Sequence, residues 1–517
     1  MSLPPHLSAL LDAGTYPHAC GEISLVETHI SWVLLTGSYA YKLKKPVRFP
    51  FVDFSTLERR EHFCREELRC NRAFAPELYH DVVALTRRPD GAVQVGGGGE
   101  IVEWAVRMRQ FPPERQLDRL LARDGLDSTL LHDFGVSLAA LHGALPGARN
   151  GRIVAREFQP VRENFATLAG LSLGAADRAV LRRCQRAALD ALSAHASWFC
   201  RRASEHRVRE CHGDLHLSNM VLMGDRVVAF DCVEFDPALR WIDTFCDIAF
   251  LFMDCLVRNR ADLAYAFLDG YLDGSGDYGG LVLLRHYAAY RSLVRAKVAA
   301  LQADWPRMRL HLRWGAQHLR SPPGSLILTC GLSGSGKSYL ATRLVPLLPA
   351  IRLRSDVARK ALAGLAPDAH SGSRIAAGLY TADRSRKTYD WLADLAVSLA
   401  RQGETVIVDA TFLQAARREQ FLELARSIGL PVLVLYCTAD EALLRRRVLA
   451  RAGQPGEPSE ADVTVLEAQL AGFEPPAPGP TVVCVDTGDA TDLALLARQL
   501  RDVVAAQATS GGSSSPE

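Results

Sequence analysis

The sequence predicts two consecutive domains of different fold class. Residues 1–320 are expected to form a two-lobed α+β domain, because strand-like stretches come first and helical stretches follow around a polar loop. Residues 325–508 are expected to form an α/β domain with a parallel, doubly wound sheet, because apolar strands alternate with helical stretches. Between the two patterns lies Arg320-Ser-Pro-Pro-Gly-Ser325, in which two prolines and a glycine end the periodicity.

Composition places the chain among ordinary globular proteins. Its 517 residues exceed what one core accommodates, and its 48% hydrophobic and 23% charged residues are typical of soluble domains. The net charge of +2 argues against a polyelectrolyte as the main partner. The 12 cysteines include no C-x-x-C pair, which favours reduced thiols over disulfides or zinc. With no signal-peptide pattern and no run of 18 apolar residues, we expect a cytoplasmic location and no membrane partner.

Strand and helix patterns can be followed through the first part. Runs of β-branched and aromatic residues predict strands, and charges gathered on one side predict helices. The run Gly96–Gly99 predicts a hairpin turn. Strands are expected at 30–35, 40–43, 82–86, 102–108 and 226–231. Helices are expected at 57–74, 130–142 and 175–203. A polar loop follows at 209–219, and after the strand at 226–231 the chain is expected to be helical again to residue 319.

The second part alternates strands with helices. Strands are expected at 326–330, 405–409, 431–436 and 481–486, with a further strand that ends in Ser355-Asp356. A helix is expected from Lys337 to Val345, before Pro346. An arginine-rich helix at 444–451 leads to a Gly/Pro-rich loop at 452–458, which we interpret as a lid. The low-complexity tail 509–517 is expected to be disordered.

The stretch from 326 to 340 contains the most specific motif, G-x-x-x-x-G-K-[ST] between a strand and a helix. Glycines allow positive φ and bring bare N–H groups to an anion, and the N-terminal end of the helix adds positive potential. Lys337 would reach the β and γ phosphates, and the Ser338 hydroxyl would ligate Mg²⁺. The alternative is a Gly/Ser-rich turn with an incidental lysine. The expected nucleotide contacts are Gly331, Ser333, Gly334, Ser335, Gly336, Lys337 and Ser338.

Acidic and basic residues follow the other strands of the second part. Asp356 would take the proton of an acceptor hydroxyl, with Arg359 one turn later on the same side. Asp409 closes an apolar strand, as a Walker B acid near magnesium or the acceptor does. Arg451, followed by Arg447, is the arginine that we expect to close over the transferring phosphate. The alternatives are a helix N-cap for Asp356, a strand-end cap for Asp409 and a solvated helix face for the arginines.

The first part has its own constellation in His212-Gly-Asp214-Leu-His-Leu-Ser-Asn219, followed by Asp231 twelve residues later. An Asp on a loop, an Asn five residues on and an Asp closing the next strand can meet at one point. They would supply one carboxylate for a hydroxyl proton and an Asn/Asp pair for magnesium. The alternative is a polar turn whose Asp and Asn cap a helix.

This loop resembles the catalytic loop of the aminoglycoside phosphotransferase and choline kinase group of the protein-kinase-like fold. The resemblance implies Asp214 as base and Asn219 and Asp231 as Mg²⁺ ligands. It implies Lys42 as the phosphate-binding lysine, paired with Glu67 or its neighbour Glu66. The sequence departs from this group in that no G-x-G-x-x-G loop precedes Lys42. The alternative for Lys42 is a solvated lysine cluster with the adjacent Lys44 and Lys45.

Glu234 and Asp236 add carboxylates beside Asp231. Two interpretations stay open for them. They orient a cationic or hydroxylated substrate, or they belong to a solvated loop.

The second part resembles the small P-loop kinases, namely polynucleotide kinase, gluconate kinase and zeta-toxin-like proteins. The whole chain resembles a bacterial fusion of an aminoglycoside phosphotransferase-like domain with a P-loop ATP-binding domain. The resemblance implies an ATP- and Mg²⁺-dependent phosphotransferase with two tandem sites, acting on a hydroxyl of a small metabolite or nucleoside. A nucleic-acid 5′ end is less favoured because the net charge is near zero. The alternative is that one domain is a regulatory ATP-binding module, and the N-terminal domain is the favoured candidate for that role. Neither acceptor nor the oligomeric state follows from the sequence.

Overall fold

The structure is a computed structural model that describes residues 3–49, 52–148, 154–319, 322–367, 369, 381–451 and 461–511. The chain divides into two compact units. Unit 1 holds Met1–Leu126, Ala144–Glu157 and Cys200–Leu251, and unit 2 holds Asp127–Gly143, Phe158–Phe199 and Phe252–Glu517. The helices that precede the proline-rich segment therefore group with the second sheet. The domain boundary between residues 320 and 325 stays a prediction about the sequence, and residues 320 and 321 lie outside the described part of the chain.

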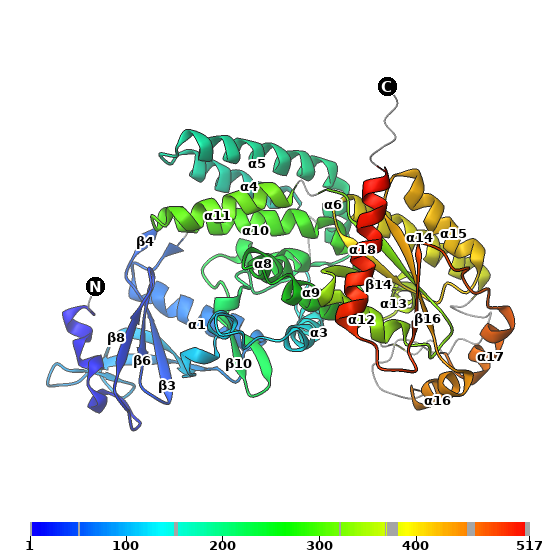
Figure 1. The fold of residues 1–517 in the computed structure, drawn as a ribbon. Coiled ribbons are helices and arrows are strands. Elements are labelled where there is room, and N and C mark those ends of the chain that lie inside the picture. The colour runs from blue at the N-terminus through cyan, green and yellow to red at the C-terminus, as the bar shows by residue number, and fades with distance from the viewer. Residues whose placement is uncertain are drawn as a thin grey trace. The chain divides into compact units, whose positions relative to one another are not determined.

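Unit 1 is built on a six-stranded sheet in the order β1-β2-β3-β8-β6-β7, in which every pairing is antiparallel (Figure 1). Tyr41 and Leu43 of β3 enter the core on one face, together with the N-terminal 3₁₀ helix η1 (Pro5–Leu11). Because side chains alternate along a strand, Lys42 and Lys44 point to the other face. The strands are β1 (Ser24–Glu27), β2 (Ser31–Leu35), β3 (Tyr39–Lys44), β6 (Tyr79–Arg87), β7 (Val93–Val95) and β8 (Glu100–Arg109).

Helix α1 (Leu57–Phe74) covers this second face, and its bounds are those that the sequence predicts. Thr56 caps it by accepting a hydrogen bond from the backbone N–H of Arg59. The predicted turn at 96–99 connects β7 to β8. The remaining elements of unit 1 are β4 (Arg48–Phe49), β5 (Val52–Asp53), α2 (Leu117–Leu121), β9 (Val208–Glu210), β10 (Met220–Met223), β11 (Arg226–Ala229), α7 (Pro237–Arg240) and β12 (Trp241–Asp243).

Helices make up the first part of unit 2. Close approach between α3 and α9 requires glycine, because a Cβ at Gly270 would lie 1.9 Å from the carbonyl oxygen of His132. The helices are α3 (Ser128–Ala144), α5 (Ala175–Ala194), α9 (Ala261–Ser275), α10 (Leu281–Leu301) and α11 (Trp305–His318). The chain passes from one unit to the other within α4 (Val154–Ala169), α6 (Ala196–Ser204) and α8 (Thr244–Val257). Among the described helices, none is long and apolar enough to cross a membrane.

The second part of unit 2 is a five-stranded parallel sheet in the order β14-β15-β13-β16-β17. The fully buried strand β13 is central, and helices α12 and α18 pack together on the sheet (Figure 1). The strands are β13 (Ser325–Cys330), β14 (Ala350–Arg354), β15 (Thr405–Asp409), β16 (Val432–Thr438) and β17 (Val482–Asp486). The helices are α12 (Lys337–Leu347), α13 (Ser355–Leu362), α14 (Ala382–Arg401), α15 (Ala415–Ser427), α16 (Glu441–Arg451), α17 (Val463–Gly472) and α18 (Leu493–Gly511).

Both predicted fold classes are confirmed, with local corrections. Helix α12 continues through Pro346 to Leu347 instead of ending before the proline. Helix α18 runs to Gly511, so the first three residues of the predicted tail are helical, and residues 512–517 lie outside the described residues. The lid loop predicted at 452–458 also lies outside them.

Two buried histidines of α10 and α11 make unit 2 sensitive to acid. Burial lowers the pKa of both His286 and His311 to about 4. In the unfolded chain each would titrate near its ordinary pKa of about 6.5. Their neutral forms therefore stabilise the fold fully above that value, and this stability falls as the pH drops toward the folded-state pKa. Between about pH 7.5 and about pH 5.5 we expect a loss of about 1 kcal/mol from each histidine.

The measurement is unfolding in denaturant at both pH values for the wild type and for His286→Leu. The variant removes one proton-binding group, so its stability should fall less between the two pH values. An equal loss in both proteins would contradict the assignment.

Candidate nucleotide sites

The loop after β13 has the geometry of a phosphate cradle. Gly331, Gly334 and Gly336 have φ of 140°, 83° and 79°, a region that residues with a Cβ rarely adopt. Space is also lacking, because a Cβ at Gly334 would lie 2.7 Å from the carbonyl oxygen of Leu444. Helix α12 begins at Lys337, directly after the loop, so its N-terminal N–H groups face the same space. The backbone N–H of Ser333 donates to Gln469 Oε1 at 2.8 Å, a partner on α17 that the sequence did not indicate.

Lys337 and Ser338 are the first two residues of helix α12, directly after the loop. The buried Lys337 Nζ donates to Leu332 O at 2.7 Å and to Ser335 Oγ at 3.4 Å, and burial lowers its pKa. Ser338 Oγ donates to Asp409 Oδ1 at 3.1 Å. The other oxygen of Asp409, Oδ2, is buried and has no hydrogen-bond partner among the described residues. A hydroxyl beside a carboxylate with an unused buried oxygen suits Mg²⁺, which prefers oxygen ligands.

The predicted acceptor residues lie on the first turn of α13 and just after it. Arg359 Nη1 donates to Asp356 Oδ1 at 2.9 Å. Asp356 makes no capping bond to the start of α13, so the N-cap alternative does not hold for it. Its side chain is 30% exposed, and that of Arg359 is 10% exposed. A half-buried carboxylate oriented by a buried guanidinium is available to a hydroxyl group of a bound molecule.

The two arginines predicted for the lid differ in their surroundings. Arg447 is held in place, since it donates to Thr487 Oγ1 at 2.9 Å, to Thr487 O at 2.7 Å and to Gly334 O at 3.3 Å. Arg451 Nη2 is buried without a hydrogen-bond partner among the described residues. Arg447 therefore supports the loop, whereas Arg451 keeps a donor for a ligand.

One cavity of about 1280 Å³ brings these groups together. The predicted residues that line it are Ser333, Gly334, Gly336, Lys337, Ser338, Asp356, Arg359, Asp409, Arg447 and Arg451, while Gly331 and Ser335 belong to the same loop. Four charged residues that sequence reasoning missed also line it, namely Asp273, Arg352, Arg354 and Asp489. The sequence contains a pattern that could have identified Arg352 and Arg354, because these arginines alternate with buried apolar residues in β14.

Unit 1 holds a second cluster of charges, which begins at Lys42. Its Nζ donates to Glu67 Oε1 at 2.7 Å and to Asp231 Oδ1 at 2.5 Å. Burial alone would lower the pKa of Lys42, but Asp231 and Glu67 raise it well above its ordinary value. Asp231 has a φ of 63° and its N–H donates to Tyr79 Oη at 3.1 Å. A left-handed aspartate is uncommon and points to a conformation fixed by its surroundings.

Lys44 corrects the picture of a solvated lysine cluster, because it is fully buried and pairs with both Glu67 and Glu234. Glu234 is buried too, so it is neither solvated nor free to orient a substrate. Burial would raise the pKa of Glu67, but Lys42 and Lys44 together lower it to about 2. The position of Lys44 two residues after Lys42 on one strand was the signal for this pairing.

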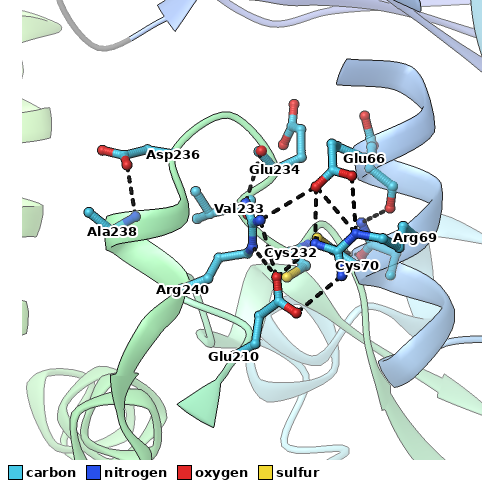
Figure 2. Close-up of polar contacts among 12 residues, drawn as sticks. Glu66, Arg69, Cys70, Glu210, Cys232, Val233, Glu234, Asp236, Ala238 and Arg240 are labelled. Carbon is cyan, nitrogen blue, oxygen red and sulfur yellow. Dashed lines mark hydrogen bonds and ion pairs between the residues drawn. The ribbon is translucent and has the colours of Figure 1, made fainter. Parts of the chain in front are cut away.

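Lys42 pairs with Glu67, while Glu66 has other partners, which Figure 2 shows. Glu66 pairs with Arg69 at 3.0 Å and lies 3.5 Å from the buried Arg240. Arg240 also binds Glu210 at 3.2 Å and the carbonyl oxygens of Val233 and Glu234. Asp236 accepts from the N–H of Ala238 and caps α7, so it has a local structural role (Figure 2).

Hydrogen bonds from its backbone and from Asn219 fix the loop of Asp214. Asp247 of α8 is buried and accepts hydrogen bonds from the N–H groups of His212, at 3.1 Å, and Gly213, at 2.8 Å. Asn219 Nδ2 donates to Asp214 O at 3.1 Å and to Asp214 Oδ2 at 3.0 Å. The N–H of Phe230 donates to Asn219 O at 2.9 Å, so the β10–β11 hairpin brings Asn219 beside the residue that precedes Asp231. Asp214 is thus bound to Asn219 just before the hairpin, and Asp231, just after the hairpin, is bound to Lys42 of β3.

Residues 326–476 match the family model described as AAA domain. The matched segment includes the loop of Gly331–Lys337 and strands β14 to β16. A protein of Mycobacterium tuberculosis H37Rv, named as uncharacterized, is 29% identical over 467 residues, which cover 87% of this chain and 91% of the relative. A protein of Mycobacterium bovis matches with the same values. Because the match spans 467 residues, it extends over both parts of the chain.

Solved structures match each part separately. A gluconokinase from Sinorhizobium meliloti is 22% identical and covers 37% of this chain and 96% of its own, with a TM-score of 0.25. A choline/ethanolamine kinase family protein from Mesorhizobium loti is 14% identical and covers 62% and 92%, with a TM-score of 0.37. An aminoglycoside phosphotransferase from Alicyclobacillus acidocaldarius is 16% identical and covers 62% and 94%, also with a TM-score of 0.37. The P-loop family match and the cavity support phosphoryl-transfer chemistry in general.

The buried charges of unit 1 predict a large effect of Lys44→Met. The substitution leaves Glu67 and Glu234 buried without their shared cation, which should cost about 3–5 kcal/mol of stability. Adding Glu234→Gln should recover part of the loss, because one unpaired charge is removed. Thermal unfolding of both variants tests this, with Lys387→Met as control, since the Lys387 side chain is 71% exposed. A single variant as stable as the control would contradict the buried pairing.

Proposed function

We propose that the protein is an ATP- and Mg²⁺-dependent phosphotransferase with two nucleotide sites, one in each unit. The observation that carries the proposal is the cavity of unit 2, in which a glycine cradle, Lys337 and the Ser338–Asp409 pair face Asp356. Such a site transfers the γ-phosphoryl group of ATP to a hydroxyl of a small metabolite or nucleoside.

The residues of unit 2 divide the work. Lys337 leaves the loop carbonyl for the phosphates, and Arg451 offers its unused donor to the charge that develops on the transferring group. Asp356 takes the proton of the acceptor hydroxyl as the new oxygen–phosphorus bond forms and the bond to the β–γ bridging oxygen breaks. Ser338 and Asp409 would hold Mg²⁺, which neutralises the phosphate charge when bound.

Unit 1 carries the parts of a second such site. Lys42, held by Glu67, is placed to bind phosphate, and Asp231 and Asn219 would hold the metal. Asp214 would accept the hydroxyl proton, since its carboxylate is oriented by Asn219. The cluster contains three carboxylates and two lysines, namely Asp231, Glu67, Glu234, Lys42 and Lys44. With all five groups ionised, its net charge is negative by one, and this charge favours the binding of a cation.

Turnover of ATP with Mg²⁺ tests both sites, measured with a panel of sugars, nucleosides, aminoglycosides and 5′-hydroxyl oligonucleotides. Lys337→Met should lower the unit 2 activity by about 10²-fold or more, because it removes a preorganised cation. Asp214→Asn should lower the unit 1 activity by about 10²–10⁴-fold, because it removes a base without changing shape.

Matched controls are Lys387→Met and Asp225→Asn, both at exposed positions. If each test variant abolishes a different activity, both sites are kinases. If every activity is lost in Lys337→Met alone, unit 1 has another role. Wild-type turnover in both variants would overturn the proposal.

A further inference from the structure

A buried guanidinium lies beside the acid of the P-loop site. Arg352 is 2% exposed, and its Nη1 is 3.7 Å from Asp409 Oδ2, which accepts no hydrogen bond from any described residue. A cation this close competes with any metal ion for the same carboxylate. Something must therefore hold the charge of Arg352 away from Asp409.

Helix α9 supplies two carboxylates that do so. Arg352 Nε donates to Asp269 Oδ1 at 2.9 Å, and Nη2 donates to Asp269 Oδ2 at 3.0 Å and to Asp273 Oδ2 at 2.7 Å. Asp273 Oδ1 accepts a further bond, at 3.1 Å, from Arg354. His132 Nε2 of α3 also lies 3.6 Å from Asp273 Oδ2 and 3.8 Å from Asp269 Oδ2, so the two carboxylates face two guanidinium groups and an imidazole. The bidentate geometry directs the donors of Arg352 toward α9 and leaves only Nη1 near Asp409.

Helix α9 is fixed along the edge of the sheet at both ends. At its start, Tyr265 binds the buried Glu404, which immediately precedes β15. Arg285 of α10 donates to the same carboxylate at 2.7 Å. Just beyond its end, Tyr278 Oη accepts from the N–H of Arg354 at 3.0 Å. These contacts fix α9 against β14, so Asp269 and Asp273 keep their positions beside Arg352.

We propose that Asp269 and Asp273 are positioning residues of the P-loop site, which hold Arg352 on α9 and keep Asp409 available to the magnesium ion of the bound nucleotide. This inference depends on the proposed function of unit 2. Both aspartates lie outside the 326–476 match, so the working site extends beyond the P-loop domain into helices that precede it in the chain.

Asp273→Asn in the full chain tests the proposal. ATP binding is measured by calorimetry over a series of Mg²⁺ concentrations and in EDTA, and the P-loop component is the part lost in Lys337→Met. We expect the Mg²⁺ concentration for half-maximal binding to rise by about tenfold, as for other groups that orient a metal ligand. Metal-free ATP binding should stay unchanged or tighten, because the site gains positive charge. The double variant Asp273→Asn/Arg352→Gln should return the Mg²⁺ requirement toward the wild-type value.

Asp262→Asn is the matched control, since Asp262 lies on the same helix but pairs with Arg260. An unchanged Mg²⁺ requirement in Asp273→Asn would overturn the proposal. So would equal weakening of metal-free and metal-bound ATP, or a double variant as impaired as the single one. If Asp273→Asn does not fold, Asp269→Asn replaces it, with the same expected and opposing results. If the wild type binds no ATP that Lys337→Met abolishes, the proposed function of unit 2 fails as well.

Discussion

The carboxylate of Asp409 is the point on which unit 2 is organised. Strands β13 and β15 are parallel neighbours, so the loop after one strand and the acid that ends the other meet at the same edge, where Ser338 joins them. The next strand, β14, pairs Arg354 with Asp409 and brings Arg352 within reach of it. A carboxylate that must stay open to a cation cannot tolerate an uncompensated arginine, and this requirement explains acids on α9 far from the motif.

In unit 1, too, each buried charge is balanced by a side chain of opposite charge. The sequence of contacts Asp231–Lys42–Glu67–Lys44–Glu234 alternates in charge, so each buried group has an opposite partner. Such a chain is stable only when complete, because a buried charge without a partner is costly. Only its outer end is exposed, where the Asp231 side chain is 43% accessible. The buried lysine–glutamate pairs thus fix the one carboxylate that faces solvent.

The sequence predicted those features that depend on residues close together in the chain. The P-loop, the acid that ends β15 and the bounds of α1 follow from spacing and periodicity, and the structure agrees with them. Two other acids were predicted to end strands, but Asp356 lies in the first turn of α13 and Asp231 lies two residues beyond β11. Lys44 was also within reach of that reasoning, since period two places it beside Lys42. The choice between Glu66 and Glu67 was not, because neighbouring helix positions differ only in what packs against them. The pairing of Arg352 with Asp269 spans 83 residues and depends on how α9 lies along β14, which no local pattern encodes.

The two lysines differ in what they must release before they can bind phosphate. Lys337 gives up a loop carbonyl and a hydroxyl, both neutral acceptors, so an anion replaces them at little cost. Lys42 is bound by two carboxylates, and phosphate would bring further negative charge to the same place. Phosphate can take the place of Asp231 only if that carboxylate gains another cation. In the proposed function, metal and nucleotide binding are therefore coupled more tightly in unit 1 than in unit 2. The difference arises from the hydrogen-bond acceptors around each lysine and not from the lysines themselves.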